Sequence, residues 1–402
     1  MGGDDRDMRI SVSLLALALF GAACGGGDDA TDASAPTTTT TEAATTTTEV
    51  TTTTAAPTTT TDPPPPETTE APAPTLFSER GPWSVGIITL DLGDRLADVY
   101  YPAIPEPDAE TEIFDSLGVF PEEFQAFIPD ELSGLYDTTA YRDAIPANDE
   151  QAHPVLVYSH GFGSFRQASS FHTSHVASYG FVVITTDHLE RGIAAQVRGE
   201  LGGGAENQDV LDVLASLDAL AAHPEVGPIA DLERVAITGH SAGGWTAASA
   251  AAEDIIDVYL SIASGAPETV TPKPAVVFIG EGDATVTPDR SYELFDQLDD
   301  AVLVNIADAG HNSFSDSCAG IYDRGGLEAL VELIGPEQVE RAEDGCVPPF
   351  VEPQRSFDTL NHYTVQFLLA QFVDPAAAGE LIDTSDAITP LADFQVIGNP
   401  LG

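Results

Sequence analysis

The sequence predicts an α/β fold with a mostly parallel central sheet and helices on both of its faces. Two observations lead to this prediction. From residue 76 to residue 402, apolar runs of strand length alternate with helical stretches. Several of these runs, such as PVLVYSH at 154–160, are apolar almost without interruption, as expected of parallel strands that are buried on both faces. A region of this length can bury a full hydrophobic core.

The expected elements follow one another along the chain. Strands are expected at 85–90, 96–102, 154–160, 180–188, 234–240, 258–264, 275–281 and 301–307. Helices are expected at 167–178, 207–222, 242–252 and 356–372, and the last of them is expected to close the domain. Residues 103–150 break this rhythm between two strands. An insert of this length is either a lid or another functional element, or a surface decoration.

The N-terminus has the features of an export signal. Arg6 and Arg9 precede a short apolar run at 11–20, which is too short to span a bilayer permanently, and small residues lead to Cys24. This start resembles a bacterial lipoprotein signal, although Gly21 stands where that pattern prefers leucine. The resemblance implies cleavage and lipidation of Cys24. Simple secretion and a signal anchor are the alternatives.

Residues 25–75 form a low-complexity segment of threonine runs and prolines with almost no large apolar side chain, which predicts a disordered stalk. The expected organisation is therefore a signal peptide at 1–24, a linker at 25–75 and a catalytic domain at 76–402. The chain carries 65 Asp and Glu against 14 Lys and Arg. Such a surface repels nucleic acid and anionic lipid, so we expect no nucleic-acid partner and no membrane contact beyond the N-terminal anchor.

The most specific motif is GHSAGG at 239–244, which fits G-x-S-x-G and lies between an expected strand and an expected helix. A nucleophilic serine in this context sits in a strained turn that projects its hydroxyl from the sheet. The residues two before and two after it crowd each other and must be small. The helix that follows also directs its N-terminal N–H groups at the site. Ser241 is the predicted nucleophile.

A serine nucleophile needs a base and an acid, which in this context follow it in the order acid, then histidine. Only His311 and His362 follow Ser241. His311 comes directly after the last expected strand, where a loop can present it. His362 lies within an expected helix and is better explained as a surface or core residue. We therefore predict His311 as the base.

The acid is expected on a loop between Ser241 and His311. Asp283 follows the strand expected at 275–281 and is the predicted acid, which would orient His311 and stabilise its imidazolium. Glu281 and Asp257 are the alternatives. A fourth carboxylate, at Asp308, lies too close to His311 in sequence to be its partner.

The developing oxyanion needs two N–H donors. The backbone of Ala242, next to the nucleophile, is one. The loop at 160–163 (HGFG) offers the other, for which Phe162 is predicted because glycine on either side lets the backbone approach the substrate. This chemistry needs no cofactor. His172 and His175 lie three apart in an expected helix, but without other ligands nearby they predict no metal site.

Longer stretches carry a family resemblance. PVLVYSHGFGSFRQASSFHTSHVASYGFVVITTDH (154–188), GHSAGG and GHNSFSD (310–316) are similar to segments of platelet-activating-factor acetylhydrolases and of the dienelactone-hydrolase and cutinase-like polyester-hydrolase branches of the α/β-hydrolase superfamily. The resemblance implies the α/β-hydrolase fold, Ser241 and His311 as nucleophile and base, and Phe162 and Ala242 as oxyanion donors. One feature departs from the acetylhydrolases, whose acid follows an earlier strand. Here that strand reads LSIASGAPE and offers no aspartate, whereas Asp283 follows the next strand, as in the other two branches.

Cys318 and Cys346 lie close together after the predicted base, on either side of a segment with an expected helical stretch at 326–333, and are expected to form a disulfide in an exported chain. In the chain-entropy model a loop of this length contributes about 3–4 kcal/mol, less any strain, and this bridge would steady the loop that holds His311.

The sequence as a whole predicts a secreted, monomeric serine esterase, held on the outer face of a bacterial membrane as a lipoprotein or otherwise released. Its substrates are expected to be small-molecule or lipid carboxylic esters of short-chain, lipid or polyester type. A peptidase, an acyltransferase, a C–C hydrolase and a non-catalytic surface lipoprotein are the alternatives.

Overall fold

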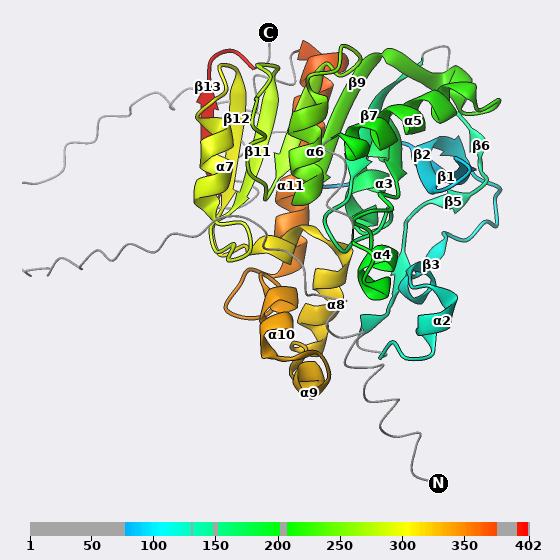
Figure 1. The fold of residues 1–402 in the computed structure, drawn as a ribbon. Helices are drawn as coiled ribbons and strands as arrows, with labels where there is room; N and C mark the ends of the chain where they lie inside the picture. The colour runs from blue at the N-terminus through cyan, green and yellow to red at the C-terminus, as the bar shows by residue number, and fades with distance from the viewer. Residues whose placement is uncertain (1–76, 130–131, 148–151, 202–206, 376–391, 401–402) are drawn as a thin grey trace, which may run out of the picture. The chain divides into compact units, whose positions relative to one another are not determined.

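The computed structural model describes residues 77–129, 132–147, 152–201, 207–375 and 392–400 (Figure 1). The predicted export signal, Cys24 and the stalk lie outside these residues. The described chain is organised around one sheet with the strand order β13-β12-β11-β10-β9-β7-β8-β2-β1-β5, and β6 also pairs with β2. The sheet strands among the described residues are β1 (Ser84–Asp91), β2 (Leu96–Ile104), β5 (Tyr141–Arg142), β6 (Ile145–Pro146), β7 (His153–Ser159), β8 (Val182–Thr186), β9 (Ala230–His240), β10 (Val258–Ile262), β11 (Ala275–Gly280), β12 (Ala301–Ile306) and β13 (Ala392–Ile397).

The centre of the sheet is parallel, as the uninterrupted apolar runs predict. Neighbouring strands from β12 across β11, β10, β9 and β7 to β8 all pair in parallel, and each residue of β7, β8, β10, β11 and β12 is buried. The antiparallel pairs lie toward the two sides, where β2 pairs with β8 and β1, and β13 pairs with β12. Parallel strands end at a common edge, and this edge receives the loops that carry the predicted site residues.

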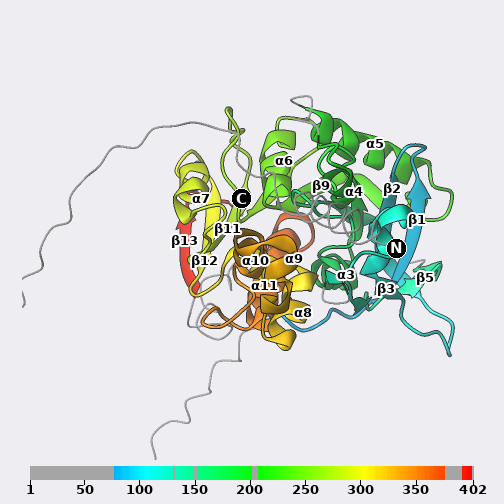
Figure 2. The ribbon, with the colours of Figure 1, turned by 60° about the horizontal axis from the view of Figure 1, so that its bottom comes forward.

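Helices cover both faces of the sheet (Figures 1 and 2). Helices α5 (Gln208–Ala222), α6 (Ala242–Ala250) and α7 (Pro288–Phe295) pack on one face, and α3 (Ser170–Ser178) and α11 (Pro353–Phe372) pack on the other. Side chains of β7 alternate between the two layers: Val155 and Val157 join the first hydrophobic cluster and Leu156 joins the second. The predicted fold class, a mostly parallel sheet between two helical layers, is confirmed.

The insert at 103–150 is only partly a separate structure. Its short strands β5 and β6 join the central sheet, while β3 (Ile113–Asp115) and β4 (Leu135–Asp137) form a small sheet of their own with η1 (Ser116–Val119) and α2 (Glu122–Gln125) nearby. The insert meets the segment 316–347 at Leu132, which packs against apolar clusters from both. That segment contains α8 (Asp316–Arg324), η5 (Glu328–Leu330), α9 (Val331–Ile334) and α10 (Pro336–Glu343).

Three sequence expectations differ from the structure. The C-terminal helix does not close the domain, because β13 follows it and adds an antiparallel strand beside β12. The helix expected from residue 167 begins at Ser170, where the carboxylate of Asp316 accepts its first N–H group. The helical stretch expected around 326–333 is divided between η5 and α9. No described helix has both the length and the apolar character needed to cross a membrane.

Candidate active site

Ser241 occupies the turn between β9 and α6. Its φ of +56° and ψ of −122° form a backbone conformation that residues other than glycine rarely adopt. Its N–H donates to the carbonyl oxygen of Ile262 at the end of the neighbouring strand β10, at 2.8 Å. The surrounding sheet therefore holds a strained turn at its carboxyl edge, which is where a strand–turn–helix motif places a reactive serine.

Glycines on both sides of Ser241 make this turn possible. A Cβ at Gly239 would lie 2.3 Å from the carbonyl oxygen of Gly243, and a Cβ at Gly243 would lie 1.9 Å from the carbonyl oxygen of Ser159. Backbone atoms on both sides leave no flexible group that could move aside. The crowding that the motif predicts is therefore present at both positions.

Gly243→Ala is expected to reduce stability and activity together, because the added methyl group meets the main chain of β7. We expect the free energy of unfolding, measured by urea denaturation, to fall by about 3 kcal/mol. Gly118→Ala is the matched control, since a Cβ there meets nothing within 4 Å. A Gly243→Ala variant that unfolds at the same urea concentration as the wild type would show that the turn can relax.

Ser241, His311 and Asp283 lie in one chain of hydrogen bonds at this edge. The Nε2 atom of His311 is 3.0 Å from the Oγ atom of Ser241, and its Nδ1 atom is 2.8 Å from Oδ2 of Asp283. Because a carboxylate accepts, Nδ1 carries the proton and Nε2 is left to accept from the serine hydroxyl. Asp283 and His311 are only 4% and 6% exposed, so water competes little with these bonds. The three residues have the arrangement of a nucleophile, a base and an orienting acid.

The loops that hold these groups are fixed by local hydrogen bonds. Asp283 follows β11, and its second oxygen accepts the N–H groups of Thr285 at 2.9 Å and Val286 at 2.7 Å. His311 begins a short 3-10 helix, η4 (His311–Phe314), after β12. Its carbonyl oxygen is 2.8 Å from Nε2 of His240, which must be the donor. Burial, together with nearby His311, lowers the pKa of His240 to about 3, so this ring stays neutral and acts as a fixed donor.

The alternative residues lie elsewhere. Asp257 precedes β10, at the amino end of the strand, and accepts the N–H of Val235. Glu281 is exposed. His362 is buried in α11 and accepts the N–H of Phe77 at 2.9 Å, so it is a core histidine. None of these contacts brings an alternative residue to Ser241.

The loop at 160–163 lies beside the serine. A Cβ at Gly161 would be 3.4 Å from the Cβ of Ser241, so the backbone passes close to it. The ring of His160 accepts the N–H of His188 at Nε2, so its Nδ1 carries a proton and donates to the carbonyl oxygen of Gly161 at 2.8 Å. This bond fixes the peptide plane that also contains the Phe162 N–H, which points away from the anchored carbonyl. Ala242 is the first residue of α6, and its N–H has no acceptor within the helix.

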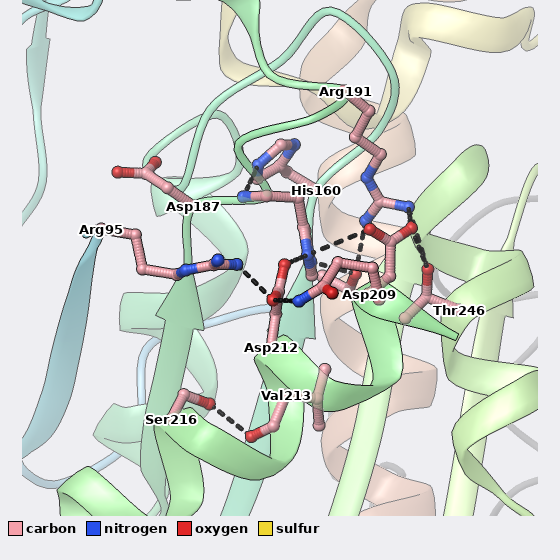
Figure 3. A network of polar contacts seen from close by, with 12 residues as sticks. Arg95, His160, Asp187, Arg191, Asp209, Asp212, Val213, Ser216 and Thr246 are labelled. Atoms are coloured by element: carbon pink, nitrogen blue, oxygen red, sulfur yellow. Dashed lines mark hydrogen bonds and ion pairs between the residues drawn. The ribbon is translucent and has the colours of Figure 1, made fainter. Parts of the chain in front are cut away.

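A buried polar network around Arg191 lies next to this loop and supports it (Figure 3). The guanidinium of Arg191 donates to Oγ of Ser159 at 2.7 Å, to Oγ1 of Thr246 at 2.9 Å and to Asp209 at 2.6 Å. The carbonyl oxygen of Arg191 also accepts the N–H of Gly163 at 2.7 Å. Arg191 thus connects β7, α5, α6 and the loop at 160–163. The sequence shows no sign of this role, because its partners are distant in the chain.

The same network contains the candidate metal cluster of His188, Asp209 and Asp212. His188 Nδ1 lies 3.1 Å from Asp212, and its Nε2 lies 2.8 Å from the Ser159 hydroxyl. Burial, followed by the charges of Arg191 and Arg95, lowers the pKa of His188 well below its ordinary value, so it is neutral. Arg191 pairs with Asp209, and Arg95 pairs with Asp212. The two carboxylates are therefore already balanced by two guanidinium groups, and the cluster is better explained as a structural network.

His172 and His175, which share helix α3, do not converge on a common ligand. Nδ1 of His172 is 2.8 Å from the side-chain oxygen of Asn361, and Nε2 of His175 is 2.7 Å from the carbonyl oxygen of Phe77. Burial lowers the pKa of each to about 4, which keeps both rings neutral. Each histidine belongs to the core.

A cavity of about 260 Å³ opens beside Ser241 and His311. Its lining comes mainly from the loop at 160–165, helix α4 (Ile193–Arg198), the insert at 103–150 and the segment 316–347. The apolar lining residues include Phe120, Leu132, Phe162, Phe165, Ile193, Ile321 and Leu327. The insert therefore contributes directly to the space next to the reactive hydroxyl, which its position in the sequence alone does not reveal.

Cys318 and Cys346 form the disulfide that the sequence predicts, with Cα atoms 4.9 Å apart. Both residues are fully buried in a small apolar cluster that is distinct from the two main core clusters. The bridge closes the segment that contains α8, η5, α9 and α10, directly after the loop that carries His311.

The parallel sheet, the strained serine turn after β9 and the triad loops after β11 and β12 define the α/β-hydrolase fold. A family model described as Chlorophyllase matches residues 144–264. Platelet-activating factor acetylhydrolase of Cavia porcellus is 26% identical over 137 residues, which is 30% of this chain and 30% of that protein. Ferulic acid esterase from Streptomyces cinnamoneus has a similar structure, with a TM-score of 0.54 and 18% identity over 74% of this chain and 93% of that one.

The Chlorophyllase match includes the loop at 160–163 and the turn at Ser241. The chain belongs to the α/β-hydrolase superfamily, and the resemblance stated from the sequence is confirmed at that level.

Proposed function

We propose that this protein is a serine hydrolase that cleaves carboxylic esters. The observation that carries the proposal is the chain of hydrogen bonds from Asp283 through His311 to Ser241, at 2.8 and 3.0 Å, beside an apolar cavity. Proteins named as an acetylhydrolase and as a ferulic acid esterase are among its relatives and structural neighbours, which supports ester chemistry over the other reactions known for this fold.

The proposed reaction has two steps. Ser241 Oγ attacks the ester carbonyl carbon while His311 Nε2 takes its proton, and His311 then gives this proton to the leaving alkoxide. The product alcohol departs and leaves an acyl group on Ser241. Water, activated by His311, then attacks the acyl group, and the carboxylic acid leaves. Asp283 keeps His311 in the required tautomer and stabilises its charged form.

The oxyanion that forms in each step is assigned to two backbone donors. Ala242 N–H stands at the start of α6, and Phe162 N–H stands in the loop anchored by His160 and Arg191. Donors that are fixed before the reaction contribute about 3–4 kcal/mol each to stabilisation of the transition state, because they need no reorganisation. The steps require no cofactor.

The acyl or alcohol part of the substrate is assigned to the apolar cavity. Phe120 and Leu132 of the insert line it, so we propose that the insert limits the length of the bound chain. A series of p-nitrophenyl esters from acetate to palmitate, compared with peptide p-nitroanilides, tests both proposals. Turnover that peaks at one chain length is expected. A wild-type enzyme that hydrolyses the anilides and no ester would contradict the ester assignment.

We also propose that the protein is exported, acts as a monomer and is held on the outer face of a bacterial membrane by a lipid on Cys24. The apolar run at 11–20, followed by small residues and Cys24, supports export and lipidation, and the stalk at 25–75 would hold the catalytic domain away from the bilayer. Labelled palmitate is expected to enter the wild-type protein and not the Cys24→Ala variant. Label that persists in that variant would contradict lipidation at Cys24.

A further inference from the structure

A second buried carboxyl group contacts the loops that carry the proposed triad. Asp344 follows α10 and is 5% exposed. Within the described part of the chain no Lys or Arg lies within salt-bridge distance of it. A carboxyl group so deeply buried needs hydrogen bonds in place of those it would make with water, and here four donors converge on it.

The donors belong to the two loops that hold the acid and the base. We call residues 281–287, after β11, the acid loop and residues 307–315, after β12, the base loop. On the acid loop, Oδ2 of Asp344 accepts Ala284 N–H at 3.1 Å, Thr285 N–H at 3.0 Å and the Thr285 hydroxyl at 2.7 Å. On the base loop, Oδ1 accepts the N–H of His311 itself at 3.2 Å. One carboxylate therefore bridges both loops.

One of these bonds is shared with the proposed acid. The N–H of Thr285 points to Oδ1 of Asp283 at 2.9 Å and to Oδ2 of Asp344 at 3.0 Å. Asp344 thus contacts the N–H of Thr285, which also holds Asp283, and the backbone N–H of His311. None of its side-chain hydrogen bonds within the described residues reaches Ser241. Its position is that of a residue that acts through the triad.

The backbone around Asp344 is pressed against the base loop. A Cβ at Gly310 would lie 2.5 Å from Oδ1 of Asp344, and a Cβ at Gly345 would lie 2.4 Å from Oγ of Ser313. Ser313 Oγ also donates to the carbonyl oxygen of Gly345 at 3.0 Å. Cys346 follows directly and is bonded to Cys318. The disulfide therefore restrains Gly345, and with it Asp344, next to the base loop.

We propose that Asp344 is a positioning residue that holds the acid loop and the base loop in their reactive arrangement, and that the Cys318–Cys346 disulfide keeps Asp344 in place. This inference rests on the proposed function of Ser241, His311 and Asp283. It assigns to the segment 316–347 a part in catalysis in addition to its part in lining the cavity.

The main test is Asp344→Asn, which retains the side-chain size but turns one acceptor oxygen into an NH2 group that faces N–H donors. We expect kcat to fall by about 100-fold while KM changes by less than about threefold, since a small displacement of catalytic groups costs about this much. Thr285→Val, which removes one of the four donors, is the milder second variant and should lower kcat several-fold. Wild-type kcat in both variants would overturn the proposal.

A double-mutant cycle separates positioning from general destabilisation. If Asp344 acts through Asp283 and His311, its replacement should cost little further activity in an Asp283→Asn background, where the effects of groups that act as a unit are not additive. If the double variant instead lost kcat by the product of the two single-variant factors, Asp344 would only stabilise the fold. Asp316→Asn is the matched control: the side chain of Asp316 is half-buried and also accepts three hydrogen bonds, from Ser170 N–H, the Ser170 hydroxyl and Phe171 N–H, but these donors all lie in helix α3 and not in the acid loop or the base loop. It should change the melting temperature and leave kcat nearly unchanged.

The disulfide is tested in the same assays. Cys318→Ser/Cys346→Ser should lower kcat in the wild-type background and have little further effect with Asp344→Asn; an unchanged kcat would overturn this part. Labelling of Ser241 by a fluorophosphonate provides a second readout, because it needs an activated serine but no ester substrate. If no ester is cleaved, the proposed function fails, yet slower labelling of Asp344→Asn would still support positioning, and equal labelling would overturn it.

Discussion

Ser241→Ala is expected to lower kcat for the best p-nitrophenyl ester by about 10⁶-fold, to the level that binding and the oxyanion donors alone can support. Alanine removes the attacking oxygen and leaves Nε2 of His311 without the hydroxyl whose proton it would take. It should fold normally, because Ser241 already occupies a strained backbone that a methyl side chain also fits. The measurement is steady-state hydrolysis, with circular dichroism to compare the folds.

The control for this variant is Ser249→Ala, one residue before the end of the same helix α6. Its hydroxyl donates to the carbonyl oxygen of Trp245 in the same helix, about two turns from Ser241, so activity should be retained. Equal turnover by the wild type and by Ser241→Ala would contradict the role of Ser241 and, with it, the proposed function.

Asp283→Asn is expected to lower kcat by about 10⁴-fold with a small change in KM. The amide nitrogen can face His311 Nδ1, in which case the ring takes the tautomer that carries its proton on Nε2. That tautomer cannot accept the proton of Ser241. The loss should therefore appear in the chemical step, and acyl-enzyme should accumulate more slowly in rapid-mixing experiments with an activated ester.

Asp257→Asn is the matched control for the acid. Asp257 is one of the two alternatives to Asp283 that the sequence leaves open, and it lies at the amino end of β10, where it accepts the N–H of Val235. We expect near wild-type activity for this variant. A large loss from Asp257→Asn, with little loss from Asp283→Asn, would show that the acid has been assigned wrongly.

The parts of the fold that the sequence predicts well are those with a strong local signal. Strands such as β7 and β11 are apolar along their whole length, and only burial on both faces explains that pattern. The signal of the serine turn is equally local. Its glycines are required because a Cβ there would clash with backbone atoms within a few residues of Ser241 and in the neighbouring strand β7. His311 and Asp283 can be predicted as site residues because each follows a recognisable strand.

The parts that the sequence does not predict depend on distant partners. Strand β13 has a weak pattern of its own and is a strand because β12 pairs with it. The edge strands β5 and β6 are only two residues long, so their pairing with β1 and β2 decides their conformation. The helices of the segment 316–347 pack around the disulfide in their own small cluster.

The sequence by itself determined the fold class, the strained turn at Ser241 and the order of the triad residues, because these depend on local periodicity and on backbone sterics near one motif. Only the tertiary structure decided which carboxylate faces His311, that His160 and Arg191 support the loop at 160–163, and that Asp344 bridges the acid and base loops. These depend on hydrogen bonds between residues far apart in the chain. The sequence does not show whether an aspartate is buried or exposed. The role of each aspartate depends on the hydrogen-bond donors that the fold places around it.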